Sequence, residues 1–66
     1  MAKKPPKILH EGVHGKHYVR VWKEKREWVV QVWKNKDIPD GEPDGDWAMP
    51  GILSMLAAIE QSIAQT

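Results

Sequence analysis

Apolar and polar side chains alternate most clearly between positions 17 and 34 of the chain. Two short runs in this stretch, Tyr18–Trp22 and Trp28–Trp33, consist almost entirely of β-branched and aromatic residues. That composition is typical of strands, and the polar residues 23–27 separate the two runs. We therefore predict a β-hairpin as the centre of the fold.

The connection between the two predicted strands contains no Gly, Asn or Pro, so a tight primed turn is not strongly indicated. A two-residue loop at Lys25-Arg26 and a four-residue loop over residues 24–27 give the same pairing, in which Val21 faces Val30. A loop of three or five residues would shift one strand and mix the two faces of the hairpin. The interpretation of the faces depends on this register.

With that pairing, the alternation of side chains sorts the hairpin into two surfaces. The more hydrophobic surface, which we expect to form the core, holds Val19, Val21, Trp28, Val30 and Val32. The second surface, which we expect to face outward, holds Tyr18, Trp22, Val29 and Trp33 around Arg20 and Gln31.

The flanking segments add a first strand, a loop and a helix. Residues 7–11 are predicted to form a short first strand, followed by a turn at residues 12–15. Residues 37–49 are predicted to be an acidic loop, because Pro-Asp-Gly occurs twice in it. A helix over residues 50–65 is expected to begin with Pro50, and Trp47 to fill the join between loop and helix. Its apolar stripe should cover the valine surface and consists of Ile52, Met55, Leu56, Ile59 and Ile63.

These elements predict a single small α+β domain over residues 1–66. Its architecture is a three-stranded antiparallel β-meander (residues 7–36) followed by one C-terminal helix packed on one sheet face. Residues 1–6 are basic and rich in Pro, and we expect a flexible arm there. A chain of this size buries only about 60% of its unfolded surface. Since there is no Cys to form a disulfide, a homodimer is expected to add stability.

Charge is distributed unevenly along the chain, although the net charge is only +1. Residues 1–36 hold all ten Lys and Arg with three acids, and residues 37–66 hold six acids and no base. No apolar run is long enough to cross a membrane, and residues 1–7 lack the apolar segment of a secretory signal. Together with the absence of Cys, this leads us to expect a cytoplasmic protein with no membrane partner.

The histidines raise the question of a metal site. Residues 10–14 match the zinc-protease pattern His-Glu-x-x-His, whose chemistry needs both His on one helical face. Gly12 and Gly15 interrupt any helix there, so we predict no metalloprotease. His10, His14 and His17 are interpreted as turn residues that would bind Zn, Ni or Cu only adventitiously, and no cofactor is expected. The acidic loop does not have the spacing of an EF-hand, so no Ca²⁺ site is predicted either.

We find no nucleophile–base arrangement and no Gly-rich phosphate loop, so the protein is predicted not to be an enzyme. The first hypothesis is a nucleic-acid-binding protein that prefers single strands, because aromatic side chains on a sheet can stack on bases and cations can contact phosphates. The predicted contact residues are Tyr18, Arg20, Trp22, Trp33, Lys16, Lys23, Lys25, Arg26 and Lys34. The alternative is a protein-interaction module or homodimer that uses the same Tyr/Trp face.

Overall fold

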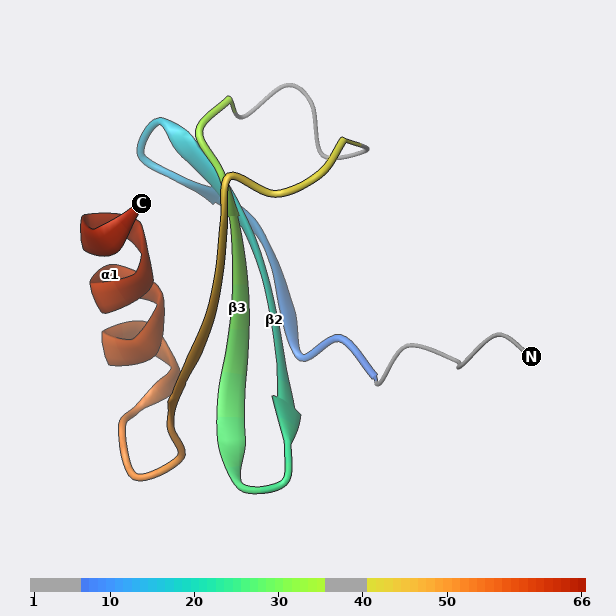
Figure 1. Ribbon diagram of the computed structural model, residues 1–66, viewed down its shortest axis with the longest axis vertical. Coiled ribbons are helices and arrows are strands. Elements are labelled where there is room, and N and C mark those ends of the chain that lie inside the picture. Colours follow the sequence, from blue (N-terminus) through green and yellow to red (C-terminus); the bar gives the residue numbers. More distant parts are fainter. Residues whose placement is uncertain (1–6, 36–40) are drawn as a thin grey trace.

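A computed structural model describes residues 7–35 and 41–66 of the chain. The sheet is antiparallel, with its strands in the order β1-β2-β3-β4, and one helix, α1, lies against one of its faces (Figure 1). The elements are β1 (His10–His14), β2 (His17–Glu24), β3 (Glu27–Trp33), β4 (Gly45–Pro50) and α1 (Met55–Gln65). The α+β class is confirmed, but the prediction of three strands is wrong because β4 adds a fourth. The arm predicted at residues 1–6 lies outside the described residues.

The central hairpin has the predicted register. In β2 and β3, Val21 pairs with Val30 and Trp22 with Val29. The connection is the two-residue alternative, since Glu24 pairs with Glu27 across it. Lys25 and Arg26 have φ angles of 48° and 68°, and positive φ at both central residues is the mark of a type I′ turn. That turn matches the twist of the strands it joins, although neither residue favours the left-handed region.

The first strand begins later than predicted. β1 includes Gly12 and Val13, which we had assigned to a turn, and the turn itself is at Gly15-Lys16. Gly15 has a φ of 64°, a conformation that glycine adopts without a steric penalty. The glycine that closes the β1–β2 hairpin is therefore Gly15, whereas Gly12 lies within the strand.

β4 occupies residues that we had placed in the acidic loop. Trp47 and Met49 point to the helix side of the sheet, where Met49 is buried, while Asp46 and Ala48 are exposed on the other side. β4 is an edge strand, so Pro50 at its end breaks no interior ladder of hydrogen bonds. This short alternation was hidden by its Asp-Gly and Pro neighbours, which are typical of turns.

The helix begins at Met55 rather than at Pro50. Ser54 is the N-cap, and its Oγ accepts a hydrogen bond of 3.1 Å from the backbone N–H of Ala57. Two residues of the predicted apolar stripe are not in the core, because Ile52 is 93% exposed in the preceding turn and Leu56 is 56% exposed. The buried side chains of α1 are Ala58, Ile59 and Ser62, and half-buried Met55 and Ile63 pack against the core.

Both ends of α1 are hydrogen-bonded to indoles from the sheet. The Trp28 Nε1–H donates to the Leu53 carbonyl at 2.8 Å, just before the helix begins. The Trp47 Nε1–H donates to the Thr66 Oγ1 at 2.9 Å, at the other end. Trp47 therefore does not fill the join before the helix, as we had expected, but holds the C-terminal end of α1 against β4.

The core lies between α1 and the predicted valine surface. Val19, Val21, Val30 and Val32 are fully buried there. α1 packs over β3 and β4 and reaches β2, whereas β1 lies beyond it. Among the residues described, no helix is long and apolar enough to span a lipid bilayer.

Candidate binding face of the sheet

The face of the sheet opposite α1, called the open face below, carries the candidate site. α1 lies on one side of the strands, and the segment that leads into β4 reaches across the other side (Figure 1). Side chains that alternate with the core valines point to the open face. Its aromatic and charged members are Glu11, Tyr18, Arg20, Trp22, Glu24, Glu27, Trp33 and Asp46.

A polar cluster joins β1 to β2 on this face. The Tyr18 hydroxyl donates a hydrogen bond of 2.5 Å to the Glu11 carboxylate, and Arg20 forms a salt bridge of 2.9 Å with the same oxygen. The Arg20 guanidinium also lies over the Trp33 ring, 5.2 Å from its centroid. Arg20, predicted to contact a ligand, is thus already engaged by a carboxylate and an indole of its own chain.

The two acids of this cluster influence each other. The hydrogen bond from Tyr18, and then that from Arg20, lowers the pKa of Glu11 below its ordinary value. The same bond to Glu11 raises the pKa of the Tyr18 hydroxyl, because only the neutral phenol can donate this hydrogen bond to the carboxylate. The cluster is therefore most stable with Glu11 ionised and Tyr18 neutral.

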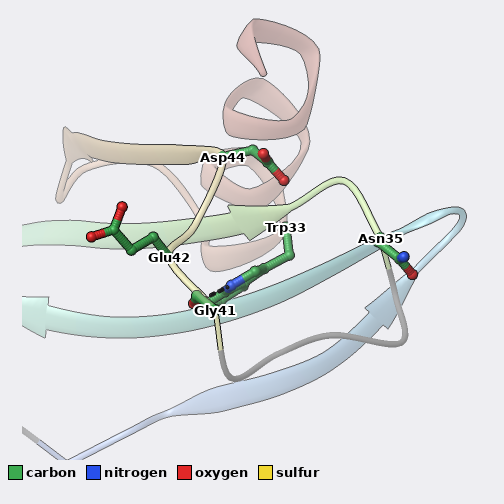
Figure 2. Close-up of a pocket in the computed structure, with 5 residues that line it drawn as sticks. All are labelled: Trp33, Asn35, Gly41, Glu42 and Asp44. Atoms are coloured by element: carbon green, nitrogen blue, oxygen red, sulfur yellow. Dashed lines mark hydrogen bonds between the residues drawn. The ribbon is translucent and has the colours of Figure 1, made fainter.

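Trp33 lies on the predicted face but is covered. Only 4% of it is exposed, and its Nε1–H donates a hydrogen bond of 2.8 Å to the Gly41 carbonyl (Figure 2). The Lys34 backbone N–H donates to the Asp44 carboxylate at 2.7 Å, which holds the same segment in place. A hollow of about 150 Å³ remains beside the indole. Trp33 therefore lies on the face away from the helix, as expected, but it is not exposed, because the chain before β4 folds over the ring.

Trp22 remains accessible and borders a larger hollow. Its indole is half-buried, and its Nε1–H donates to the Glu24 carboxylate at 2.7 Å. The hollow has a volume of about 370 Å³ and is lined by Ile8, Glu11, Arg20, Trp22 and Gln31. It combines an aromatic wall with the Gln31 amide and the Glu11–Arg20 pair. An apolar side chain flanked by polar groups fits this combination.

The charges of the open face are mainly negative. Four carboxylates, those of Glu11, Glu24, Glu27 and Asp46, project from its strands together with one cation, Arg20. The predicted lysine contacts are elsewhere. Lys23 projects to the helix side, where its Nζ lies 4.7 Å from the centroid of the Trp28 ring. The other cations among the predicted contacts are in the hairpin turns or after β3, namely Lys16, Lys25, Arg26 and Lys34.

The structure brings together four of the predicted contact residues on the open face, Tyr18, Arg20 and Trp22 at alternate positions of β2 and the covered Trp33 of β3. It adds Glu11, which the sequence analysis missed. Because β1 was predicted to end at Glu11, no register with β2 could be assigned. The two-residue turn at Gly15-Lys16 sets the register of β1 with β2, and this register places Glu11 opposite Arg20.

Comparisons with protein-family models, with curated proteins and with solved structures find no match to this chain.

Proposed function

We propose that this protein is a non-catalytic binding module whose open face holds a basic, partly apolar segment of a protein partner beside Trp22. The observation that supports this proposal is the combination of an accessible indole and a hollow with surrounding carboxylates. Aromatic side chains and Arg contribute strongly to protein interfaces, and opposite charges at the rim give specificity and fast association.

In this proposal, an apolar side chain of the partner occupies the hollow between Ile8 and Trp22. Lysine or arginine side chains on either side of it pair with Glu24 and Glu27, which are exposed at the end of the hairpin. The Gln31 amide is available to hydrogen-bond the partner's backbone. The partner is thus defined by its chemistry as a basic segment with one large apolar residue.

Binding of single-stranded nucleic acid through this face stays a prediction, and the placement of charge weighs against it. Phosphates would lie against four carboxylates and one cation already paired with Glu11. Affinity for nucleic acid depends on cations that neutralise phosphates, and these are at the ends of the strands. Of the two stacking indoles predicted, only Trp22 is accessible. The proposal therefore favours a protein partner over single-stranded nucleic acid.

A defined pair of peptides tests the proposal. A short Lys- and Leu-rich peptide and its counterpart with Glu in place of Lys are added to the ¹⁵N-labelled protein. The basic peptide should shift the amide signals around Trp22 and Gln31, more weakly as salt is added, and the acidic peptide should not. Trp22→Ala should abolish the shifts. Leu56→Ala, which trims an exposed apolar residue on the helix, should leave them unchanged.

Two further measurements complete the test. A short single-stranded oligonucleotide is titrated under the same conditions, and saturable shifts at Trp22 with oligonucleotide alone would replace this proposal with the nucleic-acid hypothesis. Sedimentation equilibrium of the free protein tests the predicted homodimer. A dimer that Trp22→Ala converts to a folded monomer would identify the occupant of the face as a second copy of this chain.

A further inference from the structure

Two histidines of β1 meet on the helix side of the sheet, beyond the area that α1 covers. His10 and His14 are both half-buried and point to the same face, four residues apart. Gly12 lies between them on that face, and a Cβ built there would have no atom within 4 Å. The two imidazoles therefore lean toward each other across the open space above Gly12.

The rings of His10 and His14 approach each other through their Nε2 atoms. The Nε2 atoms are 2.8 Å apart, and the rings are edge to face, with their centroids separated by 5.0 Å and their planes at 72°. At this distance one neutral ring can donate an N–H to the other. When both Nε2 atoms are deprotonated, each has a lone pair that can bind a metal ion.

We propose that His10 and His14 form a two-imidazole site for a divalent first-row transition-metal ion, with Cu²⁺ the best match. A metal about 2.05 Å from both nitrogens would see them at an angle of about 85°, given their separation of 2.8 Å. Tetrahedral ligands would need nitrogens about 3.3 Å apart. The observed separation matches neighbouring ligands in square-planar or octahedral coordination, which Cu²⁺ and Ni²⁺ favour, and Cu²⁺ binds nitrogen ligands most strongly.

Only two side chains are assigned to the site. His17 pairs with His14 across the strands, but no group of three or more His, Cys, Asp or Glu gathers to hold a metal in the part of the chain that the structure describes. Water completes the coordination. Glu11, which lies between the two histidines in the His-Glu-x-x-His pattern, projects to the open face and bonds to Tyr18. It cannot activate a water at this site, so the site binds a metal and does not perform metalloprotease chemistry.

Titration with CuCl₂ tests the proposal on the wild type and on three single variants, His10→Ala, His14→Ala and the matched control His17→Ala. Tryptophan fluorescence gives the affinity, and the nitrogen couplings in the electron paramagnetic resonance spectrum count the bound imidazoles. The wild type should bind one Cu²⁺ through two imidazoles. His10→Ala and His14→Ala should each bind it at least about tenfold more weakly, and His17→Ala should match the wild type. Equal affinity in the wild type and in both His10→Ala and His14→Ala overturns the proposal.

A measurement on the wild type alone removes any dependence on how the variants fold. Cu²⁺ is paramagnetic and broadens the signals of the nuclei close to it, so the imidazole ¹⁵N signals can be followed as substoichiometric CuCl₂ is added. The Nε2 signals of His10 and His14 should broaden together and more strongly than that of His17. Broadening of His17 alone, or of none of the three, contradicts the assignment. Binding should also weaken as the pH falls, because protonated imidazoles cannot act as ligands.

Discussion

The Tyr18 hydroxyl donates a hydrogen bond of 2.5 Å to the Glu11 carboxylate, across the boundary between β2 and the edge strand β1. The bond lies on the open face, and Arg20 approaches the same oxygen. It therefore connects the stability of the edge strand to the protonation of one phenol and one carboxyl group.

The first prediction concerns the ionisation of Tyr18, the only tyrosine in the chain. Its pKa is raised above the ordinary 10.0, chiefly by the hydrogen bond to Glu11. The stabilisation from this bond is therefore fully present below pH 10 and is lost as the pH rises through the higher folded-state pKa. Absorbance at the phenolate band should give a midpoint above that of a free tyrosine. Glu11→Gln should bring the midpoint down.

Glu24→Gln is the matched control, because the Glu24 carboxylate bonds to Trp22 and not to the phenol. It should leave the Tyr18 midpoint unchanged. A midpoint that is the same in the wild type and in Glu11→Gln would mean that the bond does not persist in solution.

The second prediction concerns the start of α1. The Ser54 Oγ accepts the Ala57 backbone N–H, one of the four at the helix start that have no partner within the helix. Ser54→Ala should lower the free energy of unfolding by about 1 kcal/mol, as chemical denaturation would measure. Ser54→Asp keeps an acceptor at the cap and should retain most of that stability. If Ser54→Ala and Ser54→Asp lower the free energy of unfolding by the same amount, the hydrogen bond at the cap contributes nothing to stability.

The third prediction compares two glycines. A Cβ at Gly51 would collide with the backbone carbonyl of Arg26, where the chain after β4 passes the hairpin turn. Gly51→Ala should therefore destabilise the fold by about 1–3 kcal/mol, because backbone must move. Gly12→Ala meets open space, and its φ lies outside the left-handed region, so a gain of up to about 1 kcal/mol is expected. Thermal unfolding of both variants would test this prediction. A Gly51→Ala variant more stable than Gly12→Ala would contradict the close approach of Gly51 to Arg26.

The elements that the sequence predicted well are those with a strong local pattern. Val19, Val21, Val30 and Val32 share one face only when the loop between the strands has an even number of residues, and the two-residue and four-residue loops give the same pairing. This fixed the register of β2 and β3 and the face that receives the helix. The length of the turn followed only from the structure, because Lys25 and Arg26 carry no turn preference.

The parts that were missed depend on contacts distant in sequence. Trp33 has the same strand pattern as Trp22, and what separates them is the Gly41 carbonyl, which a local pattern cannot place. β4 was missed because Pro and Asp-Gly flank its two inward residues. The negative charge of the open face was missed as well, because Glu11 and Asp46 could be assigned to that face only once the bounds of β1 and β4 were known.

The final prediction concerns the hairpin turn, where sequence and conformation disagree. Lys25 and Arg26 both have positive φ, which costs a residue with a Cβ about 1–2 kcal/mol. Arg26→Gly removes the Cβ, and Lys25→Asn supplies a residue that tolerates this region, so the double variant has the preferred type I′ sequence. It should raise the free energy of unfolding by about 1–2 kcal/mol, as measured by denaturation.

The control is Lys16→Gly in the other turn, where φ is not positive, and glycine should destabilise the fold. A double variant no more stable than the wild type would mean that packing of the Lys25 and Arg26 side chains offsets the cost. Since both are exposed and have little to pack against, the strained turn should be the easiest place to stabilise this fold.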